Sequence, residues 1–195
     1  MAAAASQPDA KQTPSPSLWW DGLERNSTSP PLETDTSADI AIVGGGYTGL
    51  WTAYFLKQIQ PELDVVLVEA KHIGHGASGR NGGWLMGALE GCDAFTDDSG
   101  TLPSAAREQL TRLVARAGEV LAKENIDCDF HHGGCVMAAA RHDVQIGRAK
   151  KTLEGFQRLG FSEDDYRWLT PSELSERIQV ANPGGAVFTP HVARI

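Results

Sequence analysis

Three glycines at a fixed spacing are the residues of this chain that most directly suggest chemistry. Gly44, Gly46 and Gly49 form a G-x-G-x-x-G pattern that follows a short apolar run. In such a turn the first glycine permits a sharp bend, the second lets the backbone approach a pyrophosphate, and the third lets a helix pack closely on a strand. The helix that follows would direct its free N–H groups and its positive dipole end at the phosphates. The spacing therefore predicts a dinucleotide-binding turn.

An acidic residue supports this prediction and narrows the choice of ligand. Glu69 ends a second apolar run, 20 residues after Gly49, at the spacing where a carboxylate accepts hydrogen bonds from an adenosine ribose. A carboxylate at this position repels the 2′-phosphate of NADP, which leaves NAD or FAD. A glycine-rich turn without any ligand is the structural alternative, and the combination of strand, turn, helix and acid argues against it.

A second glycine-rich run favours FAD over NAD. Residues 72–83, HIGHGASGRNGG, contain five glycines and come shortly after Glu69. An NAD site has no evident need for such a loop, whereas FAD lies extended across the edge of a sheet and needs backbone contacts along its length. Arg80 could balance a phosphate charge or bond the flavin, and Asn81 could fix the loop or the ring edge. A solvated surface arginine and a simple turn asparagine are the alternatives.

The apolar pattern indicates the elements that must position these residues. Residues 39–43, DIAIV, have the length and composition of a buried strand. Residues 44–60 place apolar side chains at helical spacing, and Pro61 marks the end of that helix. Residues 64–70, DVVLVEA, predict a second buried strand. Together they predict one βαβ unit with parallel strands and a right-handed crossover.

The rest of the chain alternates amphipathic helices with short strands. Residues 104–125 predict a helix with Ser104 as its N-cap. Its expected core-facing residues are Ala106, Leu110, Leu113, Val114, Ala117, Val120 and Leu121. Residues 133–140 predict a strand, and residues 144–160 predict a helix that ends at Gly160. A capping box at 170–173 predicts a short helix that reaches Ile178, and residues 184–190 predict an edge strand stopped by Pro190.

The amino-acid composition and net charge indicate what kind of protein this is and which partners are unexpected. The chain has 195 residues, 41% of them hydrophobic and 22% charged, as in globular domains. A net charge of −8 makes nucleic acid an unexpected partner. The three cysteines favour reduced thiols in the cytoplasm, and no apolar run is long enough for a membrane span. Residues 1–36 predict a disordered tail, interrupted by Trp19 and Trp20, which we expect to anchor it on the folded body or to form a partner motif.

Two long segments of the sequence resemble a known family. ADIAIVGGGYTGLWTAYFLKQ and DVVLVEAKHIGHGASGRNGG are similar to the N-terminal part of the FAD-dependent amine and amino-acid oxidoreductases of the D-amino-acid oxidase superfamily. Within that superfamily, SLWWDGL and GASGRNGG look most like the gamma-glutamylputrescine oxidoreductase branch. The resemblance runs from about residue 17 to the last residue.

The resemblance implies an α/β fold, an activity and a division into domains. It implies a Rossmann-like FAD-binding βαβ whose split parallel sheet is incomplete here, followed by the start of a mixed α+β substrate domain. The expected division is a tail at 1–36, an FAD-binding part at 37–125 and the beginning of a substrate domain at 126–195. Such enzymes oxidise a carbon–nitrogen bond of a small amine or amino acid by hydride transfer to the flavin, and oxygen is the usual electron acceptor.

The resemblance also implies which residues hold the cofactor. They are Gly44, Gly45, Gly46, Tyr47, Thr48 and Gly49 for the diphosphate, Glu69, Ala70 and Lys71 at the adenosine ribose, and Ser78, Gly79, Arg80, Asn81, Gly82 and Gly83 on the flavin side. Some relatives attach FAD through a histidine in this second loop. Residues 77–83 hold no histidine, so non-covalent FAD is expected, while His72 and His75 keep attachment open. Relatives are longer, so the chain is expected to be an N-terminal fragment whose catalytic residues lie beyond Ile195.

Other readings have less support. Cys128, His131, His132 and Cys135 have metal-binding side chains, but no second ligand pair follows them, so no metal site is expected. A disulfide-reductase-like flavoenzyme would need a C-x-x-C or C-x4-C pair, which the sequence lacks. An NAD-linked dehydrogenase and a non-catalytic FAD- or adenine-nucleotide-binding fragment remain as alternatives. The sequence makes no prediction of the amine or of the oligomeric state.

Overall fold

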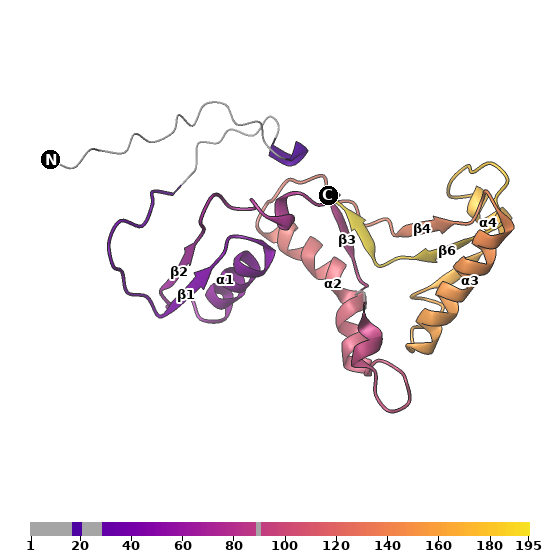
Figure 1. Cartoon of the computed structure of the whole chain (residues 1–195), viewed down its shortest axis with the longest axis horizontal. Helices are drawn as coiled ribbons and strands as arrows, with labels where there is room; N and C mark the ends of the chain where they lie inside the picture. Colours follow the sequence, from indigo (N-terminus) through magenta and orange to yellow (C-terminus); the bar gives the residue numbers. More distant parts are fainter. Residues whose placement is uncertain (1–16, 21–28, 89–90) are drawn as a thin grey trace. The chain divides into compact units, whose positions relative to one another are not determined.

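A computed structural model describes residues 17–20, 29–88 and 91–195 of the chain (Figure 1). These residues belong to two compact units, Met1–Gly82 and Gly83–Ile195. Of the expected disordered tail, residues 1–16 and 21–28 lie outside the described residues, while residues 29–36 are exposed and form neither helix nor strand. The expected boundary near residue 125 falls within the second unit, and the division into FAD-binding and substrate domains stays a prediction.

The first unit contains the predicted strand–helix–strand segment. Strand β1 (Ile40–Val43) pairs in parallel with β2 (Val65–Val68), and Ile40 stands opposite Val65. Helix α1 (Tyr47–Ile59) connects the two strands and contacts both. The described part of this unit also contains two short 3-10 helices, η1 (Leu18–Trp20) and η2 (Ala77–Gly79). The glycine turn and the acid thus sit at the same ends of two neighbouring strands, where parallel strands place their carboxyl ends together.

The second unit combines helices with two small antiparallel sheets. One sheet has the order β4-β6-β5 and the other pairs β3 with β7. Its strands are β3 (Trp84–Met86), β4 (Cys135–Ala138), β5 (Arg167–Leu169), β6 (Ala186–Thr189) and β7 (Val192–Arg194). Its helices are η3 (Cys92–Phe95), α2 (Ser104–Lys123), α3 (Asp143–Arg158) and α4 (Pro171–Ser175).

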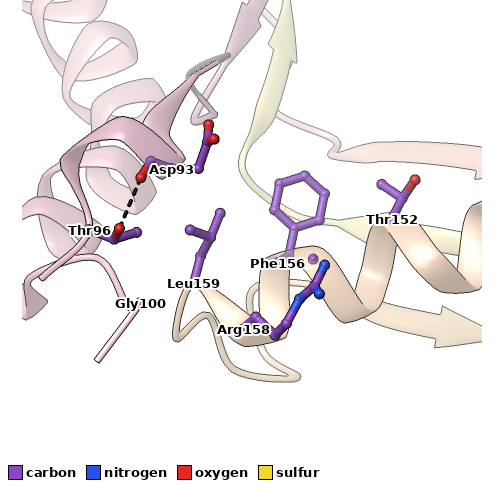
Figure 2. Close-up of a pocket in the computed structure, with 8 residues that line it drawn as sticks. Asp93, Thr96, Gly100, Thr152, Phe156, Arg158 and Leu159 are labelled. Carbon is purple, nitrogen blue, oxygen red and sulfur yellow. Dashed lines mark hydrogen bonds between the residues drawn. The ribbon is translucent and has the colours of Figure 1, made fainter. Parts of the chain in front are cut away.

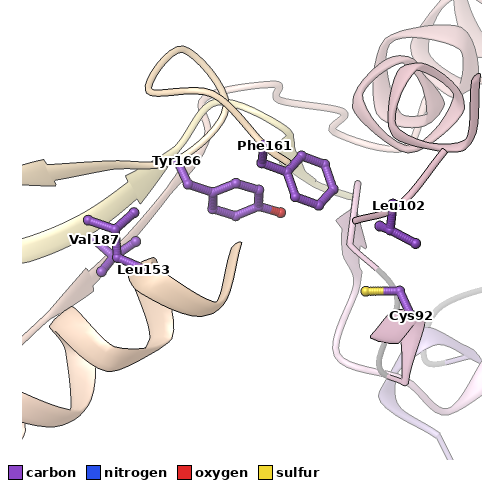
Figure 3. Close-up of a cluster of buried hydrophobic side chains, with 6 residues drawn as sticks. All are labelled: Cys92, Leu102, Leu153, Phe161, Tyr166 and Val187. Atoms are coloured by element: carbon purple, nitrogen blue, oxygen red, sulfur yellow. The ribbon is translucent and has the colours of Figure 1, made fainter. Parts of the chain in front are cut away.

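The core of the second unit gathers side chains from distant parts of its sequence (Figure 3). Its buried members are Cys92, Leu102, Leu153, Phe161, Tyr166 and Val187. The Tyr166 ring stacks on Phe156 with centroids 3.8 Å apart. Burial raises the pKa of the Tyr166 hydroxyl to about 12, so this phenol stays protonated and acts as a packing residue.

Several local predictions for the second unit are confirmed, and some are wrong. The capping box is present, with the Thr170 hydroxyl accepting a hydrogen bond from the Glu173 N–H. The helix that it opens ends at Ser175 rather than Ile178. Pro103, not Ser104, is the N-cap of α2, because the backbone is already helical at Ser104. Leu113 is 54% exposed rather than core-facing.

The largest correction concerns the strand expected at an edge. β6 lies in the middle of its sheet, with β4 on one side and β5 on the other. The flanking turn and proline suggested an edge, but Pro190 lies just after the strand, so it removes no donor from the ladder. The three-residue strands β3, β5 and β7 were not predicted, because so short a segment carries no readable alternation.

Candidate functional site

The first glycine turn joins β1 to α1 by a backbone approach that only glycine permits. Gly44 has a φ of +108°, which side-chain-bearing residues rarely adopt. A Cβ atom at Gly49 would lie 2.1 Å from the carbonyl oxygen of Gly44. The first turn of α1 therefore packs directly on the turn that precedes it, as the G-x-G-x-x-G pattern predicts.

The N-terminus of α1 presents hydrogen-bond donors at this turn. The N-cap is Gly46, which has no side chain to satisfy the first N–H groups of the helix. One of them, the Tyr47 N–H, donates to the Ser78 hydroxyl at 2.9 Å. A hydroxyl that accepts one bond can still donate its own proton. Ser78 therefore extends the donor surface of the helix end, which suits an anionic group such as a phosphate.

Glu69 is fixed beside the turn by two backbone donors. One carboxylate oxygen accepts from the Gly45 N–H at 2.8 Å, and the other accepts from the Lys71 N–H at 3.0 Å. These two hydrogen bonds hold the pKa of the Glu69 carboxyl below its ordinary value of 4.5. The side chain is therefore ionised at neutral pH. Each oxygen has a further lone pair that can accept a ribose hydroxyl.

The second glycine-rich loop repeats the pattern of the first. Gly74, Gly76 and Gly79 are also spaced as G-x-G-x-x-G, and five residues separate them from the end of β2, whereas the first set directly follows β1. Gly74 has a positive φ of +73°. A Cβ atom at Gly79 would lie 2.1 Å from the Gly74 carbonyl oxygen. This spacing is the sequence signal that identifies the repeat, and it was missed because only the abundance of glycine was considered.

Hydrogen bonds join the two loops. The Gly74 N–H donates to the Gly45 carbonyl at 2.9 Å, in addition to the bond from Tyr47 to Ser78. The Asn81 amide donates to the Tyr47 hydroxyl at 3.0 Å and to the Ser78 carbonyl at 2.7 Å. The two loops therefore form one surface. Of the predicted cofactor residues, the bonds described here bring together Gly45, Tyr47, Glu69, Lys71, Ser78 and Asn81.

Other predicted residues lie around or outside this surface. Thr48, Ala70 and Gly82 are exposed in the first unit. Arg80 is exposed, and its Nε donates to the Gly76 carbonyl at 3.2 Å, so part of its guanidinium braces its own loop. Gly83 belongs to the second unit, where its carbonyl accepts from the Ile195 N–H at 2.9 Å.

A histidine of the second loop has an unusual environment. The Nδ1 atom of His75 is buried without a hydrogen-bond partner, while its Nε2 lies 3.1 Å from the Lys71 ammonium. Desolvation, followed by the charge of Lys71, lowers the pKa of His75 below its ordinary value of 6.5. His75 is therefore neutral at neutral pH, with Nε2 placed to accept from Lys71.

The second unit has a separate hollow of about 390 Å³ between η3 and the end of α3 (Figure 2). Phe156 and Leu159 give it an apolar wall, and its charged side chains are Asp93 and Arg158. The sequence analysis singled out none of these residues for chemistry. The hollow has no G-x-G-x-x-G turn and its two charged side chains are exposed, so the glycine loops remain the candidate site.

Comparison with known proteins agrees with this geometry. The family described as DAO, FAD dependent oxidoreductase, matches residues 39–195. The chain belongs to this FAD-dependent oxidoreductase family. The match confirms the resemblance drawn from the glycine turn and the second loop, and it confirms FAD as the cofactor of the family.

Two of the curated relatives are named as oxidoreductases of an amine or an amino acid. Gamma-glutamylputrescine oxidoreductase from Escherichia coli K12 is 34% identical over 66% of this chain and 30% of its own length. Sarcosine oxidase subunit beta from Rhodobacter capsulatus is 24% identical over 84% of this chain and 35% of its own length. The chain therefore spans about a third of the length of these curated relatives.

Solved structures share the fold. Glycine oxidase from Bacillus cereus superposes with a TM-score of 0.59 at 24% identity, over 81% of this chain and 40% of that one. L-amino acid deaminase from Proteus vulgaris gives a TM-score of 0.61 at 21% identity, over 87% of this chain and 37% of that one. Among the described residues, none of the helices combines the length and hydropathy needed to cross a bilayer.

The residues present fit the cofactor of the family. A Cβ atom at Gly46 would lie 3.0 Å from the Ser78 hydroxyl, so the absence of a side chain keeps a cradle open between the two loops. The floor of this cradle carries helix N–H donors, and the ionised Glu69 lies at its side. A pyrophosphate and an adjoining ribose require this combination of donors and acceptor.

Proposed function

We propose that this chain binds FAD non-covalently through its two glycine loops and forms part of an enzyme that oxidises the carbon–nitrogen bond of a small amine or amino acid. The observation that carries the proposal is the Glu69 carboxylate, held by the Gly45 and Lys71 N–H groups at the edge of the first turn. An ionised acceptor fixed beside a helix N-terminus matches a ribose next to a pyrophosphate.

The residues of the two loops have distinct roles in this proposal. The first turn of α1 and the Ser78 hydroxyl would bind the pyrophosphate, and Glu69 would accept from the ribose. Asn81 would hold the second loop against the first through Tyr47. Arg80, exposed on the loop, would approach the flavin side. Bound FAD would supply the acceptor for a hydride from the carbon that bears the nitrogen, with oxygen as the proposed final acceptor.

The names of the relatives support the substrate class. Three proteins similar to this chain are named after gamma-glutamylputrescine, sarcosine and glycine. All three compounds carry an amine nitrogen. We extend only this shared feature to the present protein. We also propose a cytoplasmic location, which the three free cysteines support, because oxidising compartments favour paired cysteines.

Titration of the purified chain with FAD tests the proposal. Binding is followed by the change in flavin fluorescence, and the variants are Glu69→Ala and, as a matched control, Glu62→Ala, which removes an exposed carboxylate from the turn before β2. Loss of a charge-assisted contact should weaken binding about ten-fold or more in the first variant. Equal affinities for the two variants would contradict the proposed role of Glu69.

A further inference from the structure

We propose that Trp19 and Trp20 are positioning residues that hold the second glycine loop in its ligand-ready conformation. The inference rests on the proposed function, because the loop is taken to contact bound FAD. It goes beyond a packing anchor, since the two side chains contact opposite ends of one loop. Three observations support it.

Trp19 fixes the far end of the loop. Its indole N–H donates to the Asn81 carbonyl at 2.6 Å, across 62 residues of sequence. The side chain of the same asparagine donates to the Tyr47 hydroxyl and to the Ser78 carbonyl. Trp19 therefore orients the residue that ties the second loop to the first.

Trp20 covers the near end of the loop. Its ring meets the His72 ring edge-on, with centroids 4.9 Å apart. A Cβ atom at Gly74 would lie 3.5 Å from the Trp20 ring, which places the indole in van der Waals range of this positive-φ glycine. His72 in turn packs edge-on against His75 at 4.8 Å. The Trp20 ring therefore packs against residues 72–74, where the second loop begins.

Both indoles are carried by the short helix η1, whose backbone is bonded to Ser17. The Trp20 N–H donates to the Ser17 carbonyl at 3.2 Å, and the Trp19 N–H donates to the Ser17 hydroxyl at 3.3 Å. A three-residue 3-10 helix has little stability of its own, so its conformation depends on what its side chains contact. Ser78 and Arg80 lie between the two fastened ends of the loop. A loop fixed before the ligand arrives loses less entropy on binding.

The test uses the intact chain and three single variants. Trp19→Phe keeps a ring and removes the N–H donor, and Trp20→Leu removes the edge-on contact. Leu18→Ala is the control, because Leu18 is in the same helix and is 79% exposed. The first measurement is the rate of tryptic cleavage after Arg80 without FAD. The second is the dissociation constant of FAD, and the third is that of ADP, which the first loop and Glu69 would hold together with Ser78 alone of the second loop.

Both tryptophan variants should be cleaved faster after Arg80 than wild type, since an unfastened loop opens more often. FAD binding should weaken about three- to ten-fold, and ADP binding should weaken less, because ADP contacts only Ser78 of the second loop. Leu18→Ala should match wild type in every measurement.

Two results would overturn the inference. One is wild-type cleavage and wild-type FAD affinity in both tryptophan variants. The other is an equal loss of FAD and ADP binding with a lower melting temperature, which would mean that η1 only stabilises the unit. Failure of the wild-type chain to bind FAD would instead refute the proposed function, and the cleavage rates alone would then decide whether the tryptophans order the loop.

Discussion

The two glycine loops of the first unit share a spacing and a close backbone approach, yet they are held in different ways. In both, the third glycine leaves room for the carbonyl of the first, and a Cβ there would lie 2.1 Å from that oxygen. Gly49 is part of the 13-residue helix α1, whereas Gly79 ends the three-residue η2. The first loop is therefore shaped by regular secondary structure.

The second loop depends on contacts with other segments. Its side chains reach the first loop through Ser78 and Asn81, and the tryptophans of η1 contact its two ends. The same G-x-G-x-x-G spacing thus produces a helix N-terminus only where helix-forming residues follow it. The conformation of the first loop therefore depends on helix α1, whereas that of the second loop depends on its contacts with the first loop and with η1.

The largest expected effect is on the first loop. Gly49→Ala places a Cβ against the Gly44 carbonyl, and neither backbone segment can move without displacing α1 from β1. We expect a loss of about 1–3 kcal/mol in the free energy of unfolding, as for an overpacked core, together with loss of FAD binding. Thermal unfolding and FAD titration measure the two effects. Gly147→Ala in α3 is the control, because a Cβ there meets open space.

The corresponding change in the second loop should affect binding more than stability. Gly79→Ala creates the same 2.1 Å contact, but no long helix follows it. We expect FAD binding to weaken about ten-fold, with a stability loss below about 1 kcal/mol. Gly76→Ala is the matched control, since its φ of −77° and ψ of −154° suit alanine and a Cβ there meets nothing within 4 Å. If Gly79→Ala lost as much stability as Gly49→Ala, the proposed difference between the two loops would be contradicted.

The bond between the loops should have a smaller effect. Ser78→Ala removes the acceptor of the Tyr47 N–H, and with it the hydroxyl that we propose as a donor to the pyrophosphate. The site is exposed, so water can replace the lost bond, and we expect FAD binding to weaken about three- to ten-fold. Ser104→Ala, at an exposed position of the second unit, should leave the titration unchanged. An unaltered dissociation constant for Ser78→Ala would show that the loops reach their geometry independently.

The smallest effect should be a difference in acid sensitivity. The pKa of His75 is lowered in the folded chain, so the unfolded chain binds a proton first as the pH falls through 6.5. The stability that depends on neutral His75 is present above pH 6.5 and is lost as the pH falls toward the lowered pKa. Glu69 has a lowered pKa as well, so its contribution is lost only below its ordinary value of 4.5.

The second loop should therefore weaken at a higher pH than the first. Melting temperatures between pH 7.5 and 5 should decline for wild type and decline less for His75→Gln. Identical profiles for the two proteins would contradict the assigned state of His75.

The sequence predicted the first loop well because its signals are local. A strand, three glycines, a helix and Glu69 follow one another at fixed distances, and the structure contains each of them. The contacts of the second loop were harder to predict. The bond from Tyr47 to Ser78 joins residues 31 positions apart and depends on how two turns meet in space.

Prediction of the second unit failed where elements are short or paired at long range. β5 has three residues and pairs with β6, which lies beyond α4. Nothing in residues 184–190 indicates that a strand will pair with β6 along each of its two edges. Its central position follows from the packing of Val187 and Ala186, which are buried in the folded unit.

The separation in sequence of the residues in the proposed cofactor surface also affects how the chain folds. The bonds from Gly45 to Glu69, from Tyr47 to Ser78 and from Asn81 to Tyr47 span 24, 31 and 34 residues. The entropic cost of closing a loop grows only slowly with its length, so the three bonds differ little in that cost. All the residues that make these bonds precede the second unit in the chain. During synthesis, which proceeds from the N-terminus, a nascent chain can assemble this surface as soon as Asn81 is free to fold, while the ribosome is still adding the strands and helices of the second unit.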